Sequence, residues 1–521
     1  MNNVYVSSIL ALCRSEIFQN SLILFGLVWL SYWESMYGMY CIDDMDGVAN
    51  YDGKPQWKLD KDNKNYAPCN FHTILRWIRW HSAKIPNPNK NWKKDKQPEF
   101  ASYPKAHHRL NFWITAGSAV LLYLFLYQLF GSTLAFLTTA LFIVHPLGAQ
   151  AVAWISGIGY CLSLFFMLIG LNATLLTQGW CNSPAGWVAS LTLTGLFQYL
   201  AIQAQFAQMG VAAVYLLLGL WPQAILSAIL ALTVCRPVLQ DAVTLRVKVF
   251  NDQQMGASTK FHFRKFIVAV KSLYYYTRMA LFPKRLGLYH TFGYHYELPY
   301  IETEDKYLFY GVLTLIGWGL LFLFGSPIIQ FGVIWYLSIL FLFLNWITIH
   351  QFVSERYNWI PTIGICLIVS QILSAHNLVW LWCVLFGIAL MRTWAHLPTY
   401  FNEIQFYQSN VWNFPQSEVA VGNLGVAYTR VGMAGAAHDM WMVGTRINPE
   451  YDVNWYNLYS VMKGNNQIEI AQQHLAKALS CRTCHFPKDW IREVNDVTNL
   501  VDRMKRPPSG FTRPFQLGIP V

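Results

Sequence analysis

The chain has 521 residues, of which 54% are hydrophobic and only 12% are charged. Charged residues make up about a quarter of an ordinary soluble domain, so this composition excludes a soluble globule and indicates a polytopic membrane protein. The formal charge of +11 does not indicate a nucleic-acid partner, because the lysines gather between Lys54 and Lys105 among aspartates and prolines, as in a solvated loop at a membrane surface.

Apolar runs of membrane-crossing length, or nearly so, recur along the first three quarters of the chain. They predict an all-α fold with a polytopic helix bundle of about eleven transmembrane helices. The runs cover residues 20–40, 111–129, 133–144, 158–176, 186–202, 210–221, 224–238, 308–325, 328–349, 359–373 and 379–391.

Two polar segments, 41–110 and 240–265, interrupt these runs. The first contains the stretch FHTILRWIRW, which predicts an amphipathic helix lying at the membrane surface. The stretch KSLYYYTRMALFPKRL, with Arg278 among aromatic residues, predicts a second interfacial helix. His145 and Pro146 stand between two apolar halves, a pattern typical of a helix broken at a cavity.

After Met391 the chain becomes a soluble tail that repeats. Residues 401–417 predict a first, less regular helical pair. Residues 417–452 fit the tetratricopeptide template, and a second repeat starts 34 residues later. The signature positions of the first repeat are Leu424, Gly425, Tyr428, Ala437, Trp441, Gly444 and Pro449. The tail is therefore predicted to be an α-solenoid that binds protein partners.

The repeats end at a Cys-x-x-Cys-His motif formed by Cys481, Cys484 and His485. Two thiols at this spacing reach the vinyl groups of a haem, and the histidine ligates its iron, so the motif predicts covalent haem c. Met504 is the candidate distal ligand, with His474 as the alternative. A redox pair or half of a zinc site are the competing interpretations. The short remaining tail is too small to enclose a haem alone, which predicts a partner subunit in a larger membrane complex.

Four stretches together resemble one family: CIDDMDGVANYDGKPQW, LFIVHPLGAQAVAWISG, LFPKRLGLYHTFGY and SERYNWIPTIGICL. They are similar to segments of the TMTC-type proteins, which are transmembrane and tetratricopeptide-repeat O-mannosyltransferases with a GT-C membrane fold, and of their bacterial relatives. The resemblance implies transfer of a sugar from a polyprenyl-phosphate donor to a protein hydroxyl. The resemblance extends to about residue 480 and implies a GT-C-like domain over residues 1–394, with 41–110 as a large extracytoplasmic loop, followed by repeats over 395–480. The Cys-x-x-Cys-His motif then lies in a terminal tail over 481–521.

The resemblance and the chemistry of the side chains suggest a set of site residues. Asp43 and Asp44 are the candidate catalytic pair, because paired carboxylates can deprotonate an acceptor hydroxyl or hold a divalent metal ion. Candidate ligands of the donor phosphate are Arg356, Glu355 and Arg278, and the further cavity residues are His145 and Gln150. A hydrated loop start is the alternative for the aspartates, and a structural ion pair is the alternative for Glu355 and Arg356.

Departures from the family pattern leave two hypotheses open. Gln150 stands where the family has an acidic residue, and Ile158 stands where it has a basic one. Under either hypothesis the chain is expected in the cytoplasmic membrane with the first loop and the tail on the periplasmic side, because the haem motif and the family topology both imply that side. The first hypothesis is a GT-C glycosyltransferase. The second is a catalytically degenerate scaffold of that fold that carries one haem c for electron transfer.

Overall fold

The computed structural model describes residues 15–41, 44, 84–86, 100–102, 104–205, 209–235, 263–290, 306–346 and 353–481. Nearly all of this part of the chain is helical, which confirms the predicted all-α class. The exception is one short antiparallel pair formed by β1 (Lys84–Pro86) and β2 (Phe100–Ser102).

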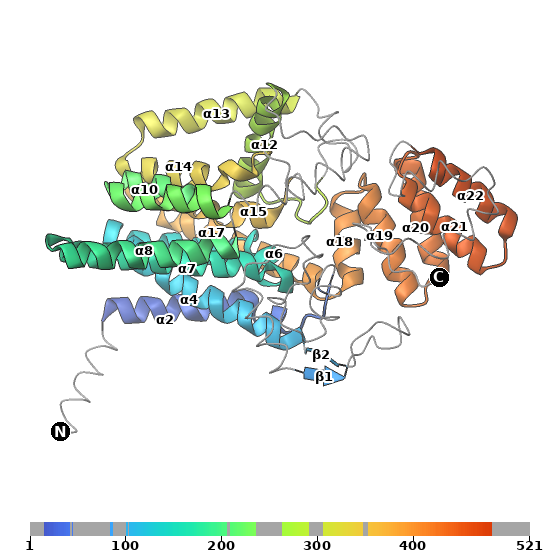
Figure 1. Ribbon diagram of the computed structural model, residues 1–521, viewed down its shortest axis with the longest axis horizontal. Coiled ribbons are helices and arrows are strands. Elements are labelled where there is room, and N and C mark those ends of the chain that lie inside the picture. Colours follow the sequence, from blue (N-terminus) through green and yellow to red (C-terminus); the bar gives the residue numbers. More distant parts are fainter. Residues whose placement is uncertain are drawn as a thin grey trace.

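An apolar helix bundle comes first in the chain. Figure 1 shows that the axes of its long helices α2, α4, α7 and α8 are roughly aligned. Its elements up to η6 are α2 (Glu16–Tyr32), η1 (Trp33–Tyr37), α4 (Pro104–Phe130), α5 (Ser132–Ile143), α6 (Gly148–Val152), η3 (Ile155–Gly157), α7 (Ile158–Thr177), η4 (Gln178–Asn182), α8 (Pro184–Ala204), α9 (Val211–Leu217), α10 (Trp221–Leu230) and η6 (Ala231–Cys235). The later elements are α12 (Phe263–Leu281), α13 (Lys306–Phe324), α14 (Pro327–Leu340), η7 (Phe341–Phe343), α15 (Glu355–Trp359), α16 (Thr362–Ala375), α17 (Val379–His396) and η8 (Leu397–Tyr400).

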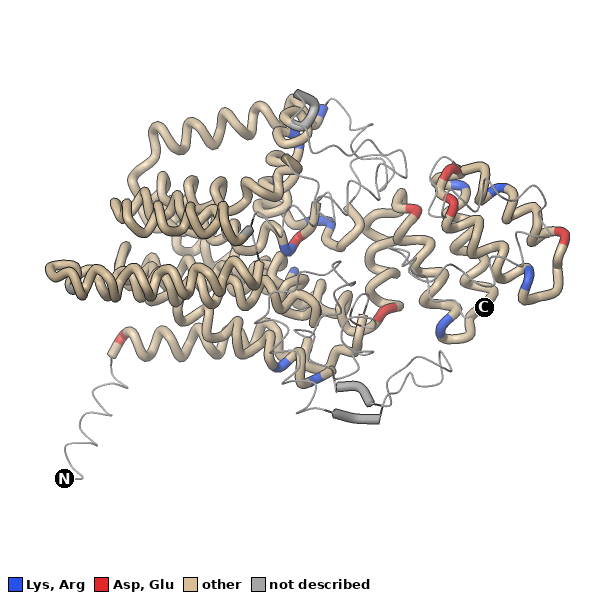
Figure 2. Tube along the Cα trace, in the orientation of Figure 1, with Lys and Arg blue, Asp and Glu red and all other residues tan. Residues whose placement is uncertain are grey.

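Five helical segments in the described part are long and apolar enough to cross a membrane. They are Pro104–Phe130, Ile155–Thr177, Pro184–Ala204, Lys306–Phe324 and Val379–Tyr400, and shorter apolar helices lie between them. The outer helices leave large apolar side chains uncovered, for example Phe324 of α13 at 81% exposure. Figure 2 shows few charged residues along these helices and more of them at the tail end of the bundle and in the tail. A continuous uncharged apolar surface of this kind suits hydrocarbon better than water.

Each of the eleven predicted apolar runs contains a helix, but several helix ends differ from the prediction. The run 20–40 leaves the α-helix at Tyr32 and continues as the 3₁₀ turn η1. The run 210–221 contains only α9, whose seven residues are too few to cross a bilayer. The reason is Gly219, which adopts a φ of 74° and turns the chain into α10.

The predicted amphipathic segment around Arg278 forms α12. Figure 1 shows α12 running across the direction of the long helices, as expected of a helix at the end of a bundle. The stretch FHTILRWIRW and most of the segment 240–265 lie outside the described residues.

The tail follows α17 and η8 and consists of α18 (Glu403–Asn413), α19 (Glu418–Arg430), α20 (Ala434–Ile447), α21 (Asp452–Gly464) and α22 (Ile468–Ser480). Each of these helices packs against the next along the chain, forming the row that Figure 1 shows beside the bundle. α21 begins at Asp452, 34 residues after α19 begins at Glu418, which is the predicted spacing. The predicted helical pair over 401–417 is wrong, because one helix, α18, occupies this segment.

Candidate functional site

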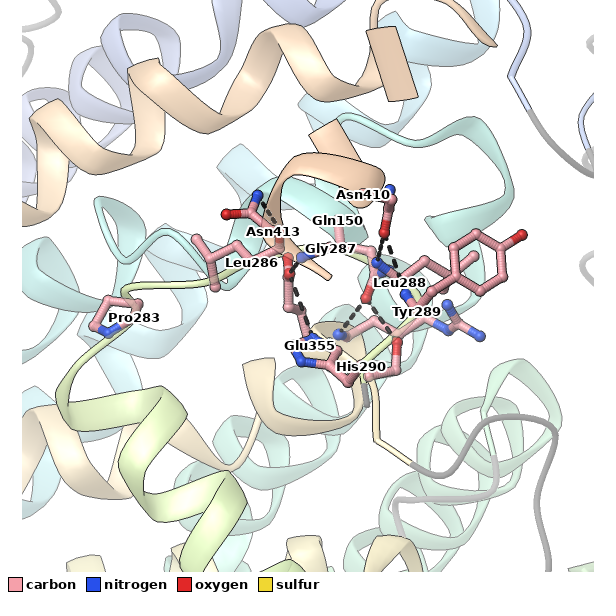
Figure 3. Close-up of polar contacts among 12 residues, drawn as sticks. Gln150, Pro283, Leu286, Gly287, Leu288, Tyr289, His290, Glu355, Asn410 and Asn413 are labelled. Atoms are coloured by element: carbon pink, nitrogen blue, oxygen red, sulfur yellow. Dashed lines mark hydrogen bonds and ion pairs between the residues drawn. The ribbon is translucent and has the colours of Figure 1, made fainter. Parts of the chain in front are cut away.

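Several of the polar residues that the sequence analysis singles out in the bundle come together at the end that faces the tail. The short helices α6 and α15 pack against each other there, and the extended segment 282–290 runs beside them. Figure 3 shows Gln150 of α6, Glu355 of α15, the 283–290 segment and two asparagines of α18 in one cluster. Segments far apart in sequence therefore build one polar site.

Asp44 is fully buried, and its carboxylate is held on both oxygens. Oδ1 accepts hydrogen bonds from the backbone N–H of Ser156, at 3.0 Å, and from the Ser156 hydroxyl. Oδ2 accepts from the backbone N–H of Cys41 at 3.3 Å. Hydrogen bonds of this kind stabilise the ionised form of a carboxylate. Asp44 is thus fixed against the start of the α7 segment, and the alternative of a hydrated loop start does not fit its burial.

Arg356 lies almost fully buried among aromatic rings, with 8% exposure. The guanidinium carbon is 5.1 Å from the ring centre of Trp154, 5.0 Å from that of Tyr357 and 5.9 Å from that of Tyr160. Cations at these distances are attracted by the ring faces, and the attraction strengthens when water is excluded. Asp44 and Arg356 therefore contact the same segment, because Asp44 binds Ser156 while Arg356 covers Trp154 and Tyr160.

Gln150 connects α6 to the first turn of α15. Its side-chain oxygen accepts two hydrogen bonds of 2.8 Å, one from the Ser354 hydroxyl and one from the backbone N–H of Arg356. The first N–H groups of a helix have no partner inside the helix, so an acceptor from another element satisfies one of them here. The side chain at position 150 thus fixes the position of the α15 backbone.

Glu355 points away from Arg356 into a separate cluster with two histidines. Its carboxylate lies 3.0 Å from His396 Nε2 and 3.8 Å from His290 Nε2, and it accepts a hydrogen bond from the Gly287 N–H. All three ionisable side chains are buried. Burial acts to raise the pKa of Glu355, but the charge and hydrogen bonds of the two histidines outweigh it and hold this pKa below its ordinary value of 4.5.

The segment 282–290 joins the bundle to the tail through backbone hydrogen bonds. Asn410 Oδ1 accepts from the N–H groups of Leu288 and Tyr289, at 2.7 and 3.2 Å, and Asn413 Nδ2 donates to the Leu286 carbonyl at 2.9 Å. Gly287 is needed for this approach, because a Cβ there would lie 2.5 Å from Asn410 Oδ1. The contacts fix α18 beside the Glu355 cluster.

Two other predicted site residues, His145 and Arg278, contact neither Asp44 nor Gln150 through any of the hydrogen bonds described above. His145 is used structurally, since Nε2 lies 2.9 Å from the Ala280 carbonyl and Nδ1 accepts from the Leu147 N–H. Arg278 is exposed on α12 and acts electrostatically on Tyr275, whose hydroxyl lies 3.2 Å from His290 Nδ1. It belongs to the surroundings of the Glu355 cluster.

The haem motif is described only at its first residue. Cys481 follows α22, is buried, and its thiol donates to the Lys477 carbonyl at 3.1 Å. Asp43, Cys484, His485 and Met504 lie outside the described residues. Within the part that is described, no group of three His, Cys, Asp or Glu side chains is arranged to hold a metal ion. Haem binding and a metal at the aspartate pair both stay predictions.

No pattern in the sequence indicates that His290, His396 and Asn410 are site residues. The two histidines are isolated in sequence and become partners of Glu355 only through the packing of the 282–290 segment and α17. Asn410 lies in a tail helix whose sequence suggests only a repeat.

Comparison with known proteins adds no identification. No protein-family model matches the chain. No curated protein matches it significantly either.

Proposed function

We propose that this chain is an integral membrane glycosyltransferase of the GT-C class that transfers a sugar from a polyprenyl phosphate to a protein hydroxyl outside the cytoplasm. The single observation that carries the proposal is the placement of Asp44 and Arg356. A buried carboxylate and a buried guanidinium contact the same segment, 154–160, at the end of an apolar bundle.

The two groups suit the two halves of a glycosyl transfer. The acceptor hydroxyl gives its proton to the Asp44 carboxylate while its oxygen bonds to the anomeric carbon. The bond between that carbon and the phosphate oxygen breaks, and the electron pair leaves with the lipid phosphate. Arg356 stabilises the resulting negative charge, because a guanidinium binds phosphate oxygens in a water-excluded site more strongly than in water.

The tail fits a role in binding the protein acceptor. Its helices repeat at the 34-residue spacing of tetratricopeptides, and Gly425 lies directly against the Trp441 ring, as the template requires. An α-solenoid of this kind provides an extended surface for polypeptides.

The test is sugar transfer by the purified protein in detergent, from a short-chain polyprenyl-phosphate sugar to a serine- and threonine-containing peptide, detected by mass spectrometry. Replacement of Asp44 by Asn is expected to reduce the rate by about 10²-fold or more, the usual contribution of a general base. Asp439→Asn, on an exposed carboxylate of the tail, is the matched control. Absence of transfer by the unaltered chain, or equal rates in Asp44→Asn, overturns the proposal.

A second candidate function is the non-catalytic scaffold with one haem c. The observation that favours it is Gln150, which replaces an acidic residue of the family pattern and uses its oxygen to hold α15. A pyridine haemochrome spectrum tests this candidate on protein produced together with a haem-attachment system. One haem per chain that is lost in Cys484→Ala supports the scaffold, and a spectrum without haem excludes it.

A further inference from the structure

The segment 282–290 begins with a turn that exposes apolar side chains next to cations. Phe282 is 73% exposed, and Leu281, the last residue of α12, is exposed beside it. Lys284 and Arg285 follow at once and are exposed as well. Neither of these two cations has a side-chain hydrogen bond or ion pair in the part of the chain that the structure describes.

Two more cations lie beside this turn. Arg278 is exposed near the end of α12, and Arg278 and Arg285 both act electrostatically on Tyr275. Arg392 of α17 donates to two backbone carbonyls of the turn, at 2.9 and 2.8 Å, which fixes the turn against α17. The basic patch consists of Arg278, Lys284, Arg285 and Arg392.

The elements around the basic patch expose no carboxylate among their described residues. Within 263–290, 306–346 and 353–400, Glu355 is the only acidic residue, and its side chain is buried against two histidines. Like charges gathered on one surface create a positive potential that attracts anions. The basic patch is therefore suited to an anionic partner.

The basic patch lies where the uncovered apolar surface of α17 ends. Ile388 and Met391 of α17 are exposed, and Arg392 follows Met391 directly. Trp394 is exposed too, and its Nε1 donates to the Leu30 carbonyl at 3.0 Å. Exposed tryptophans are typical of the level at which a membrane helix passes from the hydrocarbon to the headgroups. The patch is therefore expected at headgroup level, on the side from which α17 leads into the tail.

We propose that the basic patch binds the headgroups of anionic phospholipids while the Phe282 ring inserts into the acyl boundary. Apolar side chains beside cations favour a lipid surface over a free anion or an acidic polypeptide, because a bilayer offers phosphate groups directly above hydrocarbon. The inference goes beyond the proposed function and applies equally to the scaffold, since neither Asp44 nor Arg356 takes part in it.

A lipid bound here restrains the junction between the bundle and the tail. The next residues along the chain include Gly287 and Leu288, whose N–H groups donate to Glu355 and Asn410. A ligand that binds only the folded protein stabilises it. We therefore expect anionic phospholipid to raise the melting temperature of the full-length protein.

Two variants separate the charges of the turn from its apolar tip. The double variant Lys284→Gln with Arg285→Gln removes two cations whose side chains hold nothing in the described structure, so it is expected to fold. Phe282→Ser removes the exposed ring and keeps the cations. Arg446→Gln with Lys477→Gln removes the same charge from exposed positions of the tail and is the matched control.

The experiment is native mass spectrometry of the full-length protein in detergent, titrated with phosphatidylglycerol or with phosphatidylcholine of identical acyl chains. We expect phosphatidylglycerol to bind more tightly and to raise the melting temperature more. In the double variant of the turn, the affinity for phosphatidylglycerol is expected to fall by about tenfold or more, because each cation near an anionic lipid surface contributes to binding. Phosphatidylcholine binding is expected to stay unchanged in this variant, whereas Phe282→Ser is expected to weaken both lipids.

Each outcome decides the proposal. Equal affinities for phosphatidylglycerol in the double variant of the turn and in the tail control overturn it, as does a chain that binds both lipids equally. Competition by glycerol phosphate at the same concentrations as the lipid would reveal a site for free anions, and binding of polyglutamate in place of the lipid would reveal a surface for acidic polypeptides. Either result overturns the lipid surface.

The salt dependence of the unaltered chain tests the proposal even if the double variant does not fold. Raising the salt concentration from about 0.05 M to about 0.5 M screens exposed charges. It is expected to weaken the binding of phosphatidylglycerol several-fold and to leave phosphatidylcholine unaffected. Binding of phosphatidylglycerol that does not respond to salt overturns the proposal.

Discussion

At the scale of single residues, the Glu355 cluster predicts a stability that depends on pH. Glu355 faces His396 of α17 and His290 of the 282–290 segment, with Tyr275 of α12 and Tyr400 of η8 close by. The pKa of Glu355 is lower in the folded protein than its ordinary value of 4.5. A group of this kind stabilises the fold fully above its unfolded pKa, and this contribution is lost as the pH falls through its folded pKa.

We therefore expect Glu355→Gln to lower the free energy of unfolding by about 1–3 kcal/mol near neutral pH, because the buried His396 ring and the Gly287 N–H lose the carboxylate that they contact. The difference from the unaltered chain is expected to shrink as the pH falls below 4.5. Thermal unfolding in detergent across this pH range measures it, with the exposed Glu469→Gln as the control. Parallel curves for Glu355→Gln and the unaltered chain would show that the carboxylate is not ionised in the fold.

In the sequence, Arg356, Glu355 and Gln150 stand out because they lie in two of the four stretches that resemble segments of one family. These stretches could not show that Glu355 and Arg356, although adjacent, point into different clusters. That division depends on α15 being a single helical turn whose successive side chains leave in different directions. Nor does the sequence show the partners of Glu355. His290 and His396 lie 65 and 41 residues away from it along the chain and contact it only in the folded protein.

At the scale of elements, the tail helices depend on one buried tryptophan. Trp441 of α20 is fully buried among Val426, Ala437 and Leu458, and its Nε1 donates to the Gly422 carbonyl at 2.9 Å. Trp441→Ala is expected to destabilise the tail by about 3–5 kcal/mol, because the cavity cannot be filled by the neighbouring helices. Trp412→Ala removes the same side chain at 87% exposure and is expected to change stability by about 0.5 kcal/mol or less.

Limited proteolysis at increasing urea concentration distinguishes these two tryptophan variants. Cleavage within α19–α22 is expected at lower urea in Trp441→Ala than in Trp412→Ala. Equal protection of the tail in both variants would contradict the assigned core. This core follows from the sequence, since the template pairs a small residue at 425 with a large one at 441. The ends of α9 and α10 do not follow from it, because the turn at Gly219 interrupts a continuous apolar run.

At the scale of the whole molecule, the arrangement of the helices predicts which parts share one side of the membrane. α7 runs from the site to η4 at the far end of the bundle, whereas α17 runs back to the site and leads directly into the tail. Crossing helices place their two ends on opposite sides of a bilayer. Gly179 of η4 and Gly435 of α20 are both exposed, and a Cβ at either position meets no other atom within 4 Å.

Single cysteines at these two glycines measure the topology in a variant whose native cysteines are replaced by serine. In intact cells, a membrane-impermeant maleimide is expected to label Gly435→Cys and not Gly179→Cys, because the proposed function puts the tail outside the cytoplasm. After permeabilisation both positions are expected to react. Labelling of Gly179→Cys alone in intact cells would put the tail, and with it Asp44 and Arg356, on the cytoplasmic side. A periplasmic acceptor protein and haem attachment at Cys481 would then both be excluded, because each requires the tail to lie outside.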